Sequence, residues 1–183
     1  MNTNEFDYYL IERKHDETYP LIKEVGYKPN DINPKLILLE FDDPKPRNPV
    51  MADFLEGPEV FISAKIADVI KKFNPKGVKF IQTKLTDPKK NVYENYLCMH
   101  VENRIEALDK EQSEYEYEYR VYSITKFVID RKNLGEIPLE ERLIFAPKET
   151  PARKVFHKSV VDAIMAENPT GVQFRPLENW SAF

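Results

Sequence analysis

Cys98 and His100 come nearest in this sequence to a nucleophile and its general base. They stand two positions apart in a predicted strand, so their side chains share one face with Cβ atoms about 6.5–7 Å apart. That separation is long for the hydrogen bond that activates a nucleophile, and no glycine-rich turn adjoins the pair to hold an oxyanion. The interpretation we favour is a satisfied, half-buried pair that carries no chemistry.

The residues that could ligate a metal are scattered along the chain. His15, His100 and His157 show no HxxxH or HxH spacing, which argues against zinc, and Asp42 with Asp43 before a proline is typical of a solvated turn. The glycine motifs of dinucleotide sites, phosphate-binding loops and serine hydrolases do not occur. We therefore expect no metal, no cofactor and no enzymatic activity.

The strongest functional signal is an acidic segment over residues 94–118. It holds eight acidic residues against Arg104 and Lys110, an excess of six negative charges where the whole chain has a net charge of −4. Such a field attracts a basic partner and raises its association rate more than its final affinity. The partner-binding residues that we predict are Asp109, Glu111, Glu114, Tyr115, Glu116, Tyr117, Glu118 and Tyr119.

Residues 114–122 give the clearest strand pattern of the chain. Their period of two places tyrosines on one face and glutamates on the other. Tyrosine is enriched among the residues that dominate binding energy, so this strand is our first choice of interface, with the proline-rich loop 44–58 as the second. The alternative is that the tyrosines face the core and the glutamates face water.

The elements that must position these residues are organised around a segment that occurs twice. Residues 67–80 align with residues 161–174, and seven of the fourteen aligned pairs are identical. Each copy predicts a helix, an Asn-Pro-x-Gly turn of type I in which proline keeps the asparagine out of the α region, and the start of a strand. Ser63 is positioned to cap the first helix. The repeat therefore predicts two helix-turn-strand units that support one core.

Most of the remaining chain predicts strands. Strands are expected over residues 8–12, 35–41, 78–85, 93–101, 114–122, 124–129 and 143–145. The apolar run at residues 36–39, between Asn33-Pro34 and Asp42-Asp43-Pro44, indicates a central strand covered on both faces. Residues 51–55 suggest a helical turn. We predict an α+β fold with mixed or antiparallel sheets, as one domain over residues 1–183 or two packed halves of about 1–105 and 106–183.

The composition of the chain indicates whether it is folded and which partners and compartments suit it. A hydrophobic content of 42% with 12% aromatic residues is that of a folded protein, and the mild net negative charge does not suit a nucleic-acid binder. The single cysteine fits a reducing compartment, and residues 1–7 show no secretory signal. No apolar run approaches the roughly 20 residues that cross a bilayer. We expect a cytoplasmic protein without nucleic-acid or membrane partners.

Several short segments together resemble one bacterial family, immunity protein family eleven of polymorphic toxin systems, formerly a domain of unknown function. They are YYLI at 8–11, ADF at 52–54 before VFIS at 60–63, NPKGV at 74–78, ALDKEQSEY at 107–115 and NPTGVQFRPL at 168–177. The resemblance implies a protein that protects its producer in interbacterial competition, by binding a toxin encoded beside it. It supplies no catalytic residues. We predict neutralisation by direct occlusion of the toxin.

Two other classes of function stay open. One is an enzyme that reverses a toxin's modification or acts on a small molecule, for which alanine at Cys98, His100 and Asp53 is the test. The other is an adaptor protein that associates with itself through the repeat, which the mass in solution would reveal.

Overall fold

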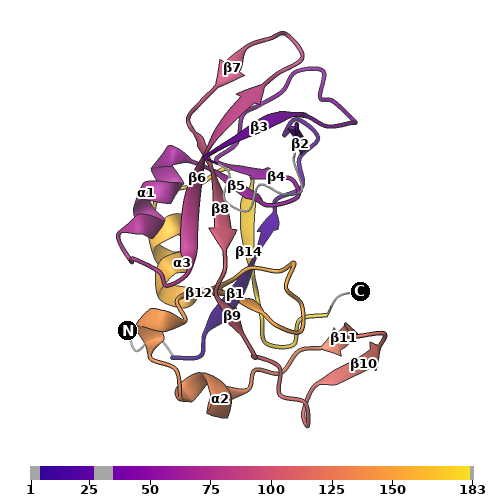
Figure 1. The fold of residues 1–183 in the computed structure, drawn as a ribbon, viewed down its shortest axis with the longest axis vertical. Helices are drawn as coiled ribbons and strands as arrows, with labels where there is room; N and C mark the ends of the chain where they lie inside the picture. The colour runs from indigo at the N-terminus through magenta and orange to yellow at the C-terminus, as the bar shows by residue number, and fades with distance from the viewer. Residues whose placement is uncertain (1–4, 27–34, 182–183) are drawn as a thin grey trace.

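The computed structural model describes residues 5–26 and 35–181. It is 40% strand and 14% helix, with mixed and antiparallel sheets, so the predicted α+β class with two helix-turn-strand units is confirmed. Figure 1 shows two large sheets with helices α1 and α3 side by side, and a small separate hairpin at one end. Residues 1–4, part of the segment without a secretory signal, and the predicted boundary Asn33-Pro34 lie outside the described residues.

The first large sheet has seven strands. Its order is β2-β3-β6-β8-β5-β4, with β7 paired to β6, and only β3 and β6 run parallel. Its strands are β2 (Ile22–Val25), β3 (Leu36–Phe41), β4 (Phe54–Glu56), β5 (Val60–Ser63), β6 (Val78–Thr86), β7 (Val92–Tyr93) and β8 (Tyr96–Val101).

The second large sheet has five strands in the order β14-β1-β13-β12-β9. Its strands are β1 (Tyr8–Arg13), β9 (Arg104–Ile105), β12 (Ile144–Pro147), β13 (Val155–His157) and β14 (Val172–Pro176). The remaining elements are α1 (Ala64–Lys71), α2 (Arg131–Gly135), the 3-10 turn η1 (Leu139–Glu141), α3 (Lys158–Met165), and the hairpin strands β10 (Glu114–Glu118) and β11 (Val121–Lys126).

The repeated segment forms two matching units, β5-α1-β6 and β13-α3-β14. Each helix is followed by a turn in which the asparagine and the glycine have positive φ: 45° at Asn74 and 68° at Gly77, 50° at Asn168 and 76° at Gly171. In the first copy the Val78 amide donates to the Pro75 carbonyl oxygen at 3.4 Å, so the turn spans residues 75–78 with Gly77 at its third position. A type I turn has a negative φ at that position, so the predicted type I turn beginning at the asparagine was wrong in detail. Asparagine tolerates the left-handed conformation that commonly ends a helix, and this lets the chain reverse before proline.

The expected cap of the first helix was also wrong in detail. Ser63 occupies the N-cap position, but its hydroxyl donates to Asp53 Oδ1 at 2.7 Å instead of accepting from the helix. At the second helix the cap is made, because His157 Nδ1 accepts a hydrogen bond from the Ser159 amide. The first unit therefore uses its serine to fix a neighbouring loop.

The two units are also similar in a third strand, which in each unit lies between the other two. β8 lies between β5 and β6, and β1 lies between β13 and β14, each antiparallel to both neighbours. The registers correspond: Ser63 opposite Tyr96 in the first unit matches His157 opposite Tyr8 in the second. Residues 8–13 thus take the place in the second unit that residues 96–101 take in the first. The second unit is a circular permutation of the first, completed by the strand at the start of the sequence.

Both units contribute to one apolar core. α1 packs against α3 (Figure 1), and the cluster around them includes Ile66 and Ile70 of α1, Val160 and Ile164 of α3, and Met99 of β8. Burial of each such side chain contributes roughly 1.5–3 kcal/mol before conformational entropy is subtracted. We propose on this basis that both halves of the chain form a single domain.

Two predicted elements differ from the structure. β3 is buried on one face only, because Leu36 and Leu38 are 49% and 44% exposed. It lies second from the sheet edge, and α1 packs over β5 and β8 instead. The helical turn expected at residues 51–55 is also wrong: Phe54 begins β4, which pairs with β5.

The described residues lack two further features. In residues 5–26 and 35–181 no helix combines the length and apolar character needed to span a bilayer. Nor do any three His, Cys, Asp or Glu side chains of these residues gather closely enough to hold a metal ion.

Candidate functional site

The predicted binding residues lie on a hairpin that stands apart from both large sheets (Figure 1). The sequence predicted one strand over residues 114–122 and another over 124–129. The structure corrects this, because the chain reverses between Glu118 and Val121. Tyr119 and Arg120 form the turn with φ of 50° and 67°. This left-handed pair usually carries Asn and Gly, so no turn signal is visible in the sequence here.

Cross-strand pairing sorts the hairpin side chains onto two faces. Tyr115 lies opposite Ile124, and Tyr117 opposite Tyr122, while Glu116 and Glu118 lie opposite Ser123 and Val121. Paired residues in an antiparallel sheet share a face. One face of the hairpin is therefore aromatic and the other is acidic, as the alternation predicted for residues 114–118.

The tyrosines do not all face the core. Tyr115 and Tyr122 pack against a buried cluster that includes Ile124. Tyr117 is 54% exposed and Tyr119 is 96% exposed. The core-facing alternative therefore holds only at the base of the hairpin, and the tip presents aromatic surface to solvent.

The loop that leads into the hairpin is fixed by Asp109. Its Oδ1 accepts from the amides of Glu111 and Gln112 at 2.9 and 3.0 Å. These bonds, first among them that of the Gln112 amide, hold the pKa of the Asp109 carboxyl below its usual value. The hydroxyl of Ser113 accepts from the Val128 amide at 2.9 Å and ties the two ends of the hairpin together. Asp109 thus has a structural use, whereas Glu111 is exposed.

The structure places Cys98 and His100 on one face of β8, but it does not bring them into a catalytic arrangement. Cys98 is 1% exposed, and burial, with the nearby carboxylates of Glu59 and Glu24, raises the pKa of its thiol to about 12. His100 instead turns Nδ1 toward Glu59 Oε1 at 3.6 Å. A thiol with this pKa stays protonated and unreactive at neutral pH, so the pair lacks the thiolate that nucleophilic catalysis needs.

Asp53 is the third residue named above for a possible enzymatic function. In the structure its carboxylate holds the turn of the second repeat unit. Its Oδ2 accepts from the Thr170 amide and hydroxyl, both at 3.0 Å, and its Oδ1 accepts from Ser63. Burial opposes the charged form, but these hydrogen bonds outweigh it and hold the pKa of Asp53 below its usual value. The carboxylate fastens the turn to the entry of β4.

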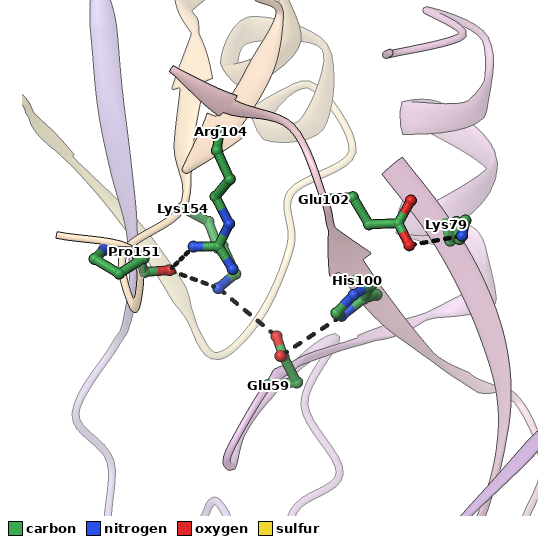
Figure 2. Close-up of polar contacts among 7 residues, drawn as sticks. All are labelled: Glu59, Lys79, His100, Glu102, Arg104, Pro151 and Lys154. Atoms are coloured by element: carbon green, nitrogen blue, oxygen red, sulfur yellow. Dashed lines mark hydrogen bonds and ion pairs between the residues drawn. The ribbon is translucent and has the colours of Figure 1, made fainter. Parts of the chain in front are cut away.

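A polar cleft that the sequence did not indicate lies where the two large sheets meet. Its volume is about 440 Å³, and segments around β1, β14, residues 54–60 and residues 152–154 line it. Figure 2 shows Glu59 between Lys154, 3.7 Å away, and His100. Arg13 and Arg175 in the lining also face carboxylates, those of Glu56 at 3.9 Å and Glu12 at 3.0 Å.

These pairings leave the cleft without a strong field of either sign. Of the lining cations, Arg13, Lys154 and Arg175 each face a carboxylate of the chain itself, which weakens the cleft's attraction for a charged ligand. The fourth, Arg153, lies 5.4 Å from the ring centroid of Trp180. The hairpin of residues 114–126, the acidic hairpin, keeps its negative field, because neither Glu116 nor Glu118 has an ion pair within the described residues. No local sequence signal could have found the cleft, since its lining comes from four separate segments.

Comparison with known proteins decides the family. A family model described as immunity protein family, Imm11, matches residues 6–179 of this chain. The chain belongs to the Imm11 immunity protein family. The match covers both repeat units and the acidic hairpin, and no curated protein matches the chain. Membership of Imm11 indicates a toxin-neutralising immunity role, which in general implies binding of a cognate toxin.

Proposed function

We propose that this Imm11 chain is a cytoplasmic immunity protein of a polymorphic toxin system used in interbacterial competition. It binds a cognate protein toxin, encoded by an adjacent gene, and neutralises it by covering the toxin's functional site directly. The proposal assigns no catalytic step to the chain, no cofactor or metal, and no nucleic-acid or membrane partner.

The observation that carries the proposal is the exposed aromatic surface on the hairpin of residues 114–126, which we call the acidic hairpin. Tyr117 and Tyr119 are 54% and 96% exposed, beside the carboxylates of Glu116 and Glu118. Tyrosine supplies a large contact area at low entropic cost, and it is enriched among residues that dominate interfaces. A stable complex buries about 800 Å² on each partner, so the loop at Asp109 and Glu111 would extend the contact.

The charge of the surface indicates the chemistry of the toxin face. Three glutamates of β10 stand against Arg120 and Lys126 of the hairpin, and the approach adds Asp109 and Glu111 against Lys110, which leaves an excess of two negative charges. A basic surface around the toxin's functional site would be attracted along this field, which raises the association rate at low ionic strength.

The test is the rate at which the purified product of the adjacent toxin gene associates with the wild-type chain and with two double variants. Glu116→Lys with Glu118→Lys should slow association by about tenfold or more at low salt, and by much less at 0.5 M salt. Glu40→Lys with Glu94→Lys makes the same change in net charge on exposed residues near β3 and β7, at the opposite end of the molecule (Figure 1). Equal slowing by both variants would remove the hairpin from the interface.

Occlusion and enzymatic protection differ in stoichiometry. If the chain covers the toxin's site, toxin activity should fall linearly and vanish near one chain per toxin. An enzyme that reverses the toxin's effect would protect at a small fraction of that ratio, and this result would overturn the occlusion mechanism.

A further inference from the structure

The turn of the acidic hairpin holds two adjacent residues in the left-handed conformation. Among the described residues six non-glycine positions have positive φ, and three of them are asparagines, which tolerate it. Tyr119 and Arg120 are the adjacent pair of this group, at φ of 50° and 67°. A two-residue turn of this type strongly prefers Asn-Gly, because asparagine and glycine tolerate positive φ whereas most other side chains are strained there. Tyr119 and Arg120 at the tip therefore carry backbone strain that Asn-Gly would not.

The strained turn displays a large side chain to solvent. Tyr119 is 96% exposed, with Tyr117 and Val121 at 54% and 62% just behind it. Three of the eight exposed large hydrophobic side chains of the described residues thus fall within five positions at one tip. Backbone strain of this kind clusters at active sites, ligand clamps and switch regions, so the exposed ring marks the turn as a candidate site.

Aromatic contacts brace the hairpin below its turn. The centroid of the Tyr122 ring lies 4.4 Å from the centroid of the Tyr117 ring and 5.4 Å from that of the Tyr115 ring. Tyr115 in turn packs on the buried cluster at the base of the hairpin. Tyr119 follows Glu118, the last paired residue of β10, so it lies at the turn beyond this stack. The tip is therefore a convex finger whose strands are braced up to Tyr117, which reduces the ordering entropy lost when it binds.

We propose that Tyr119 is an anchor that inserts into a concave apolar pocket of the toxin, whose rim is basic where it meets Glu116 and Glu118. A convex finger with one fully exposed ring fits a pocket and not a flat surface. The carboxylates of Glu116 and Glu118, on the opposite face of the hairpin, supply the charge that a basic rim complements. This inference rests on the proposed function and adds to it the residue that carries the binding and the shape of the toxin surface.

The experiment uses a repaired turn, Tyr119→Asn with Arg120→Gly, in the full chain. Because Asn-Gly relieves the strain, the melting temperature should rise by about 2–4 °C. Because the anchor is lost, Kd for the purified product of the adjacent toxin gene should rise about 30-fold or more. A variant that is more stable and yet binds more weakly separates the display of the ring from the integrity of the fold.

Two further variants serve as controls. Lys90 has a φ of 69° in the loop between β6 and β7, at the opposite end of the molecule (Figure 1). Lys90→Gly should likewise not destabilise the chain, while Kd stays within about threefold of the wild-type value. Tyr119→Phe keeps the ring and removes only the hydroxyl, so it should bind within about tenfold of the wild type.

Each outcome is decisive. A repaired turn that binds as tightly as the wild type would refute the anchor while leaving the immunity function intact. A fall in melting temperature on repair would refute the strained tip. If the wild-type chain itself does not bind the toxin, the proposed function fails, and the anchor fails with it.

Discussion

Replacing Gly171 by alanine tests how closely the second repeat turn docks on the entry to β4. Gly171 has a φ of 76°, and a Cβ at this position would lie 2.6 Å from Ala52 Cβ and 2.6 Å from the carbonyl oxygen of Phe54. The left-handed conformation costs a non-glycine residue roughly 1–2 kcal/mol. The overlap adds about 1–3 kcal/mol, since a backbone oxygen has little room to withdraw. We therefore expect a loss of about 2–5 kcal/mol in the free energy of unfolding.

Alanine substitutions at two other glycines separate the cost of the left-handed backbone from the cost of steric overlap. Gly26 has a φ of 71° with nothing within 4 Å of its added Cβ, so Gly26→Ala carries the cost of the backbone conformation alone. Gly77, the equivalent of Gly171 in the first unit, would meet the Cβ and amide nitrogen of Asn103 at 3.0 Å, and its cost should be intermediate. The smaller entropy of the unfolded alanine chain favours all three variants alike and cancels in the comparison.

Urea unfolding of the three variants gives the ranking, and thermal melting checks it. At about 2–4 °C per kcal/mol for a chain of this size, Gly171→Ala should lower the melting temperature by on the order of 10 °C. If Gly171→Ala costs no more than Gly26→Ala, the turn does not approach Ala52 and Phe54 as closely as described, and the reasoning about the docked turn is wrong.

Two further predictions concern titratable groups. The pKa of Asp53 is held below its ordinary value of 3.8, so its contribution to stability is present above pH 3.8 and is lost as pH falls further. Asp53→Asn should therefore destabilise the chain at pH 6 and by less at pH 3; a difference in urea midpoint that is the same at both pH values would contradict this. Because burial raises the pKa of Cys98 to about 12, its thiol should resist a disulfide reagent at pH 8 until urea unfolds the chain, and rapid labelling of the native protein would count against the buried site.

Local patterns in the sequence were sufficient for the repeat units. Apolar residues at helical spacing and an Asn-Pro-x-Gly turn are short-range signals, and both appear where predicted, at residues 64–80 and 158–174. These short-range signals could not predict that the second unit is a circular permutation of the first. β1 matches β8 in register with the strands beside it, but the two share only Tyr8 and Tyr96 among their paired positions, so no alignment of the sequence with itself reveals it.

The hairpin shows a different limit. Alternation correctly sorted tyrosine from glutamate on β10, because the side-chain period of a strand does not depend on the turn at its end. It could not locate the reversal at Tyr119 and Arg120, since turn prediction depends on residues that favour positive φ and neither does. The same reason hides the exposure of Tyr119, which depends on the position of the turn.

The permuted repeat also has a consequence for the order in which the chain folds during synthesis. The first unit, β5-α1-β6 with β8, lies within residues 60–101 and can form while the rest is still being made. The second cannot, because β1 is made at the beginning and its strand partners in the described part of the chain are β13 and β14, and such distant pairings form late.

The base of the acidic hairpin depends on this last step. The cluster beneath Tyr115 and Tyr122 includes Leu10 of β1 together with Leu177 and Trp180, and the Phe127 amide donates to the Trp180 carbonyl oxygen at 2.8 Å. The hairpin is thus held in position only when the two distant segments have met. A nascent chain in which β1 has not yet met residues 172–180 would therefore lack the contacts that order the base of the acidic hairpin.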